Sequence, residues 1–164
     1  MLIADPTARV SKLADLDEST RGTRIVVGAN SVIDSFVRIK CAGGTDDVVI
    51  GKDCFVNSGT VIYSGNGVRL GDHVLIAANC TLAPVNHACQ DRSRLIVEQR
   101  FLPSKGGIVI EDDVWIGAGC VILDGAILRR GVVVGACSLV RGELEAYGIY
   151  AGNPLKKIGE RTRT

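Results

Sequence analysis

Large aliphatic residues recur at every sixth position through the second half of the chain, and this spacing constrains the fold more than any other feature. The longest series is Ile110, Ile116, Ile122, Leu128, Val134 and Val140. A small or β-branched residue stands four positions after the first five of these, at Val114, Cys120, Ala126, Val132 and Ser138. Upstream, the same spacing gives Val27, Ile33 and Ile39, then Ile50, Val56 and Ile62, then Leu70, Ile76 and Leu82. The repeat therefore covers most of the chain.

A six-residue period excludes a helical repeat. An α-helix would turn each successive aliphatic by about 240° and scatter the series over every face. Glycines within the repeat, such as Gly119 and Gly125, would also be costly in a helix interior. A six-residue repeat is typical of a parallel β-helix, in which stacked coils bury the aliphatics that one repeat cannot bury alone. The sequence predicts an all-β fold, a single-stranded parallel β-helix, and the spacing does not fix its handedness.

The composition agrees with an all-β fold and limits the classes of function that the protein can have. Val and Ile together number 35, Gly 20, and aromatics make up only 4% of 164 residues, so branched aliphatics form the core of one domain, 1–164. Lys and Arg number 19 against 18 Asp and Glu, so no overall charge favours nucleic acid. No apolar run is long enough to span a bilayer and the N-terminus does not resemble a signal peptide, so we expect a cytoplasmic location.

The six cysteines show no C-x-x-C pair and no disulfide-scaffold density, so we expect free thiols. Three of them, Cys54, Cys80 and Cys120, fall on the small site of the repeat, where a thiol serves as a small buried hydrophobe.

Two interruptions leave the repeat and must form loops, where function tends to reside. The shorter, Ser64 to Gly67, predicts a bulged turn. The longer, about 88–107, is rich in charged residues and predicts an excursion away from the coils. Asn86 and His87 stand at its stem.

The chain has two histidines, and their surroundings differ. His73 follows Gly71 and Asp72 in a turn of the regular repeat, which indicates a solvated corner residue. His87 stands where a coil opens into the excursion, and it is either an ordinary loop histidine or a general base. Asp91 or Glu98 in the excursion could orient its imidazole, although charged loop residues are usually only solvated.

Other chemistries find little support. A zinc site with three histidines needs one more imidazole than the chain has, unless the ligands are mixed. No phosphate-binding loop, dinucleotide-binding glycine motif or serine-hydrolase elbow is present. The C-terminal tail is basic around Lys156 and Lys157, which indicates either a solvated end or contact with a phosphate-bearing ligand.

Several segments carry a resemblance to a known family. They are Val74–Asn79, the Asn86-His87 stem, Asp113–Gly119 and Ala151–Pro154. Together they resemble the hexapeptide-repeat acyltransferases, within the galactoside, maltose and polysaccharide O-acetyltransferase branch, over roughly residues 25–160. The resemblance implies a left-handed helix, a homotrimer with sites between neighbouring subunits, and an acyl-CoA donor, expected to be acetyl-CoA, with no metal.

The resemblance also implies site residues. His87 matches the catalytic base, and Asn57 and Asn86 match positions beside the acceptor. The positions that match the cofactor contacts are Trp115, Gly117, Ala118, Ala136, Ser138, Arg141, Lys156 and Lys157. Structural alternatives remain for three of these: Asn57 as a turn residue, Trp115 as a packing aromatic at a subunit boundary, and Ser138 as the small residue of the repeat.

The predicted function is direct acetyl transfer from acetyl-CoA to a sugar hydroxyl of a bacterial surface polysaccharide or its precursor. The chain departs from the sugar acetyltransferases in its longer excursion, in Ala88 where proline is common, and in lacking their N-terminal helical region. The lack of the helical region favours a larger glycan or a lipid-linked saccharide over a free small sugar. The alternatives are N-acetylation of an aminosugar nucleotide, and a non-catalytic or metal-dependent trimeric β-helix.

Overall fold

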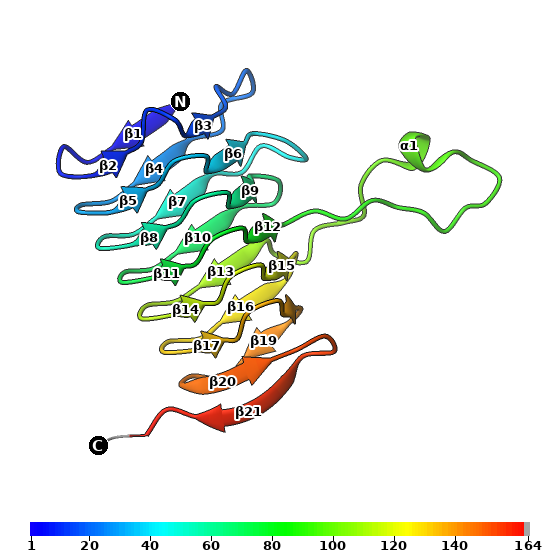
Figure 1. Cartoon of the computed structure of the whole chain (residues 1–164). Helices are drawn as coiled ribbons and strands as arrows, with labels where there is room; N and C mark the ends of the chain where they lie inside the picture. Colours follow the sequence, from blue (N-terminus) through cyan, green and yellow to red (C-terminus); the bar gives the residue numbers. More distant parts are fainter. Residues whose placement is uncertain (163–164) are drawn as a thin grey trace.

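Three parallel sheets wind around one axis in the computed structural model, which describes residues 1–162 (Figure 1). The last two residues of the predicted domain, 163–164, lie outside this part of the chain. The chain visits sheet A, sheet B and sheet C in turn, so each coil adds one strand to each sheet. This is the parallel β-helix that the six-residue period predicts.

The strands are short, and those of one sheet stack on one face of the prism. Sheet A contains β1 (Leu2–Ala4), β4 (Ile25–Val27), β7 (Val48–Ile50), β10 (Val68–Leu70), β13 (Ile108–Ile110), β16 (Ala126–Leu128) and β19 (Glu143–Leu144). Sheet B contains β2 (Arg9–Val10), β5 (Val32–Ile33), β8 (Phe55–Val56), β11 (Leu75–Ile76), β14 (Trp115–Ile116), β17 (Val133–Val134), β20 (Gly148–Ala151) and β21 (Lys156–Glu160). Sheet C contains β3 (Asp15–Leu16), β6 (Arg38–Lys40), β9 (Val61–Tyr63), β12 (Thr81–Ala83), β15 (Val121–Leu123) and β18 (Leu139–Val140).

The repeat aliphatics point inward and stack on one another. Ile76 pairs with Val56 on one side and with Ile116 on the other, and all three are at most 1% exposed. Every member of the longest sequence series is likewise buried. Stacking in register lets each aliphatic contact its equivalents above and below, which gives the dense packing that a core requires.

The three cysteines of the small site are buried, as predicted. Burial raises the pKa of the Cys54 thiol, and the thiol donates to the Gly71 carbonyl at 3.1 Å. Cys80 and Cys120 donate in the same way to the carbonyls of Gly117 and Gly135. These contacts give the buried thiols acceptors in the next coil and leave them a packing role.

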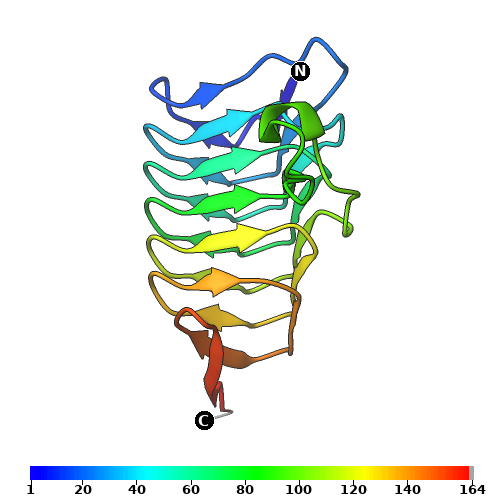
Figure 2. The ribbon, with the colours of Figure 1, turned by 90° about the vertical axis from the view of Figure 1, so that its right-hand side faces the viewer.

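All the larger departures from the regular coil leave at one corner, where sheet C passes to sheet A. Here lie the connections 17–24, 41–47 and 64–67 and the excursion, which leaves β12 and returns at β13. Gly67 donates to the Ser64 carbonyl at 2.7 Å, so 64–67 forms the expected turn. Figure 1 shows the excursion standing away from the coils, and Figure 2 shows it over this corner, with its one short helix, α1 (Ile96–Gln99).

The C-terminal end folds back as an additional strand. β21 pairs antiparallel with β20, which covers the last coil on sheet B. The tail is therefore ordered rather than a frayed end through residue 160. Within residues 1–162, no helix has the length and apolar character needed to cross a membrane.

Candidate active site

His87 lies where the two legs of the excursion meet. Its backbone forms an antiparallel bridge with Phe101, and the legs are joined by Ala88 N–H to the Arg100 carbonyl at 3.0 Å and Leu102 N–H to the Asn86 carbonyl at 2.8 Å. The imidazole stacks on the Phe101 ring, with centroids 4.6 Å apart and planes tilted by 43°. A local strand pairing thus holds His87 at the stem of the loop, with one ring face covered.

The two carboxylates considered as orienting groups serve the loop itself. Asp91 accepts hydrogen bonds from the Ser93 hydroxyl and backbone N–H, and these bonds lower the pKa of the Asp91 carboxyl below its ordinary value. Glu98 accepts from Leu95 N–H at the start of α1. Neither forms a hydrogen bond with His87 within residues 1–162. The aromatic contact with Phe101 is therefore the side-chain interaction described for the imidazole.

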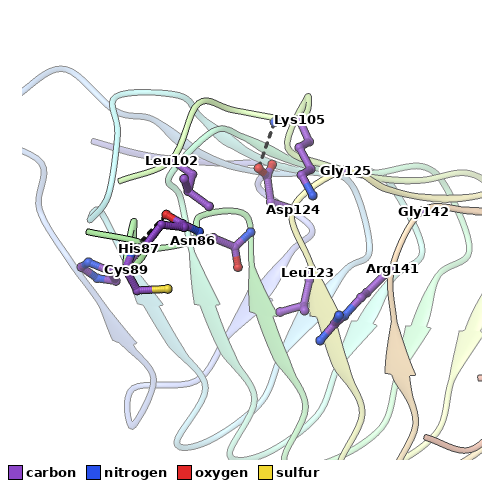
Figure 3. Close-up of a pocket in the computed structure, with 11 residues that line it drawn as sticks. Asn86, His87, Cys89, Leu102, Lys105, Leu123, Asp124, Gly125, Arg141 and Gly142 are labelled. Carbon is purple, nitrogen blue, oxygen red and sulfur yellow. Dashed lines mark hydrogen bonds between the residues drawn. The ribbon is translucent and has the colours of Figure 1, made fainter. Parts of the chain in front are cut away.

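One cavity extends from His87 toward the C-terminal coils, with a volume of about 430 Å³. Asn86 and Leu102 line it near the histidine, and Lys105 and Arg141 line it farther along. In Figure 3 the His87 imidazole and the Arg141 guanidinium lie at opposite ends of this group of residues. We call this the cationic cavity, because neither Lys105 nor Arg141 has an ion-pair partner among residues 1–162.

Asp124 fixes one wall of the cationic cavity. Asp124 directly follows β15, is only 6% exposed, and accepts a hydrogen bond from Lys105 N–H at 2.9 Å (Figure 3). It also accepts one from Gly107 N–H at 3.0 Å. These bonds tie the end of the excursion to the coil. Asp124 forms no ion pair with Lys105 or Arg141 within residues 1–162, and its one negative charge stands against the two positive charges in the lining, so the cavity keeps a net positive character.

A second cavity, of about 320 Å³, lies against the same histidine. It is lined by Ala42, Gly43, Tyr63, Ala83, Val85, His87 and Phe101. The six residues other than His87 carry no charged side chain at neutral pH. We call it the apolar cavity. His87 is the one residue that lines both the cationic and the apolar cavity.

A second group of the predicted residues lies on another part of the coil. Trp115 is on the outer face of β14 and is 50% exposed, beside a cavity that also includes His73, Leu75 and Arg161. Three further predicted residues, Gly117, Ala118 and Ala136, and also Asn57, stand at the corner between sheets B and C. The width of sheet C, about 20 Å for six residues, separates this corner from that of His87. Within one chain, His87, Asn86 and Arg141 therefore lie together. The predicted residues around Trp115 and Gly117 lie on another part of the coil, away from His87.

Several predicted contact residues make hydrogen bonds within the chain. The Asn57 amide donates to the Ile76 carbonyl at 2.6 Å. The Ser138 hydroxyl is buried, donates to the Gly135 carbonyl at 2.6 Å and accepts from Gly152 N–H at 2.9 Å. Both therefore stabilise turns. The acceptor-binding role of Asn57 and the cofactor-binding role of Ser138 stay predictions.

Gly117 and the two lysines also have defined places. A Cβ on Gly117 would lie 2.6 Å from the Ala136 nitrogen, so no side chain fits there. Lys156 is exposed, whereas Lys157 forms ion pairs with Glu145 at 2.9 Å and Glu160 at 2.5 Å. These partners raise the pKa of the Lys157 ammonium. Lys156 is thus the freer of the two for a phosphate.

Sequence reasoning missed several cavity residues. Tyr63, Phe101, Lys105 and Asp124 line the two cavities and were not predicted. Asp124 carried a usable signal, because an acidic residue directly before Gly125 at the close of a regular strand is out of keeping with the apolar repeat. The others depend on how the loops fold back, which periodicity does not describe.

Family models match two stretches of the repeat. The model described as bacterial transferase hexapeptide (six repeats) matches residues 107–142, and the hexapeptide repeat of succinyl-transferase matches residues 47–84. Fold and repeat thus define a hexapeptide-repeat β-helix of the transferase class.

Individual relatives narrow this class. A putative acetyltransferase of Saccharomyces cerevisiae is 30% identical over 153 residues, which cover 92% of this chain and 76% of that protein. The galactoside O-acetyltransferase of Escherichia coli is 32% identical over 114 residues, or 70% of this chain and 54% of that one. The chain belongs to the hexapeptide-repeat acyltransferase family, whose fold is the left-handed parallel β-helix, as predicted.

Among solved structures, AntD, an N-acyltransferase from Bacillus cereus in complex with dTDP-4-amino-4,6-dideoxyglucose and coenzyme A, matches with a TM-score of 0.80 and 25% identity. The match covers 99% of this chain and 84% of AntD. Several curated relatives are longer: the match spans 36% of a probable acetyltransferase of Mycobacterium tuberculosis and 61% of a probable macrolide acetyltransferase of Lysinibacillus sphaericus.

Proposed function

We propose that the protein transfers an acetyl group from acetyl-CoA to a hydroxyl of a sugar, in a bacterial surface polysaccharide or its precursor, with His87 as general base. The observation that carries this proposal is the position of one imidazole between two cavities of different chemistry. A base that takes a proton from the acceptor as the acceptor attacks a bound donor must lie where the two molecules meet. The similarity to the galactoside O-acetyltransferase supports this activity.

The cationic cavity suits the donor. Coenzyme A carries phosphates, and Arg141 and Lys105 are exposed cations at the end of the cavity away from the imidazole. The thioester would then lie near His87, and the phosphates toward the C-terminal coils, where Lys156 is exposed. Solved relatives such as AntD bind coenzyme A, which agrees with this donor.

The reaction needs no covalent enzyme intermediate. His87 accepts the proton of the acceptor hydroxyl as its oxygen attacks the thioester carbonyl carbon. The carbon–sulfur bond then breaks, and the imidazolium returns the proton to the departing thiolate, so that the products are the acetyl ester and free coenzyme A. A backbone N–H would stabilise the oxyanion of the tetrahedral intermediate.

The separation of the predicted contact residues supports a site formed between neighbouring subunits, as in the expected homotrimer. His87 and Arg141 lie at one corner of the coil, whereas Trp115 and Ala118 lie on the far side of sheet C. A single donor molecule can contact both groups only if they come from neighbouring copies. We therefore propose that the exposed Trp115 of one subunit faces the cationic cavity of the next.

A second candidate function is N-acetylation of an aminosugar nucleotide. The match to AntD, which is bound to an aminosugar nucleotide, covers nearly the whole chain and favours this alternative. The chemistry of His87 is compatible with either acceptor, because a general base can take a proton from an attacking amine as well as from a hydroxyl.

Mass spectrometry of acceptors incubated with acetyl-CoA and the purified protein tests the proposal. We expect a product heavier by one acetyl group, with release of coenzyme A. Treatment of the product with mild base separates the two candidates, because a sugar ester is hydrolysed and an amide is retained. Binding of neither acetyl-CoA nor coenzyme A in calorimetry would contradict both candidates.

Phe101 is expected to position the base. Replacing it by leucine removes the ring that stacks on the imidazole at 4.6 Å but keeps an apolar side chain. A less ordered imidazole lowers kcat by about tenfold and leaves the KM for acetyl-CoA unchanged, because proton removal depends on precise alignment. Phe101→Tyr keeps the ring and should restore kcat. A rise in donor KM without loss of kcat would show that Phe101 serves binding instead.

A further inference from the structure

We propose that the acceptor is an uncharged molecule that presents an apolar face beside the group to be acetylated, as a 6-deoxyhexose ring does. This inference rests on the proposed function and names the acceptor class for its site. The evidence is the chemistry of the apolar cavity, which is lined by His87 but shares no other lining residue with the cationic cavity.

The lining of the apolar cavity sets its preference. Its aliphatic part comes from Ala42, Ala83 and Val85, and its aromatic part from Tyr63 and Phe101. The Tyr63 hydroxyl forms no hydrogen bond with residues 1–162, so it is free to meet one polar group of the acceptor. The cavity thus offers a broad apolar surface, one phenol and the imidazole.

Val85, in the lining of the apolar cavity, is held rigidly in place. A Cβ on Gly43 would lie 2.9 Å from Val85 Cγ1, and one on Gly65 would lie 2.5 Å from the same atom. Val85 is therefore packed against two backbone segments that have no room to move closer. Val85 therefore presents a fixed apolar surface, and a molecule bound in this cavity must have an apolar group in contact with it.

A charged acceptor does not suit this surface. A carboxylate placed against Val85 would lose its hydration without gaining a cationic partner, so its binding would be unfavourable. The cations that could pair with it, Lys105 and Arg141, line the other cavity. A methyl group in the same position loses little hydration and gains apolar contact.

Phe101 links the acceptor to the base. Its ring stacks on the His87 imidazole and also lines the apolar cavity. An acceptor whose apolar face lies along Phe101 and Tyr63 is therefore held next to the imidazole, and a hydroxyl on its edge can reach the base. Burial of the acceptor's apolar face against Phe101 and Tyr63 would align the acceptor with the imidazole. A contact with the Tyr63 hydroxyl would select the orientation in which the acceptor binds.

Acceptor sets that differ only at C6 test the inference. One set is methyl β-D-fucoside, galactoside and galacturonide, and a second is methyl β-D-quinovoside, glucoside and glucuronide. For whichever of the two sets the protein accepts, we expect kcat/KM for the 6-deoxy sugar to be about tenfold above that for the hydroxymethyl sugar. We expect kcat/KM for the uronide to be about 100-fold below that for the hydroxymethyl sugar. Tyr63→Ser should reduce the 6-deoxy preference to about twofold, and Tyr63→Phe should keep it.

The outcomes separate this inference from the proposed function. Equal use of the three members, or preference for the uronide, would overturn the acceptor class while leaving the acetyltransferase activity in place. Binding of coenzyme A in calorimetry without transfer to any neutral member would also overturn it. No binding of coenzyme A and no transfer would overturn the proposed function itself. Tyr63→Ser is informative only through the ratio between acceptors, which a general loss of folded protein does not change.

Discussion

His87→Ala is expected to lower kcat by about 10² to 10⁴-fold, the usual contribution of a general base, with little change in the stability of the fold. The imidazole is exposed at the stem of the excursion, and the strand pairing that holds the stem uses backbone atoms. Alanine keeps these bonds. The KM for acetyl-CoA should therefore change little, because the cations of the cationic cavity remain.

The second histidine provides a matched control. His73 is exposed in a regular turn, 3.8 Å from an Asp53 oxygen, and has a positive φ of 59°. His73→Asn suits this control because asparagine tolerates that conformation. We expect kcat of the His73 variant to match that of the unmodified protein. Because His73 lines the cavity beside Trp115, this control is read from kcat and not from the KM for acetyl-CoA. Near-normal turnover of His87→Ala in the same assay would remove the proposed base.

The coil could be predicted because its physical cause is local and repeated. Each aliphatic of the series must be buried, one repeat cannot bury it, and stacking at six-residue spacing solves the problem in the same way in every coil. Residues as distant as Ile33 and Val134 therefore occupy equivalent, buried positions on sheet B. The same logic predicted that the three cysteines of the small site would be buried.

The cavities could be predicted only in part. His87 was identifiable because a lone imidazole stood at the point where the period stopped. Phe101 was not, because it meets His87 through an antiparallel pairing of two irregular legs that has no spacing signature. Connection 41–47 was missed for a related reason: a loop inserted at a corner leaves the stacked strands in register on both sides.

The site is built at the corner where insertion has least effect on the core. The inward residues of neighbouring coils remain paired across every loop at the corner between sheets C and A, as Ile50 with Leu70 and Leu70 with Ile110. Loop length there can change without a change in core packing. The buried core and the lining of the two cavities are thus formed by different residues, and substitutions in the two sets should have separable effects.

Substitutions of two adjacent residues of β11 test whether stability depends on the inward-facing residues and not on the outward-facing ones. Ile76 points inward and is 0% exposed, whereas Leu75 points outward and is 40% exposed. Ile76→Ala should lower the free energy of unfolding by about 2–5 kcal/mol, because it leaves a cavity between the paired Val56 and Ile116. Leu75→Ala should cost about 1 kcal/mol or less, since it removes partly solvated surface. Urea unfolding measures both. Equal losses would contradict the inward stacking of the repeat, whereas the predicted difference would establish that β11 depends on its one buried aliphatic residue.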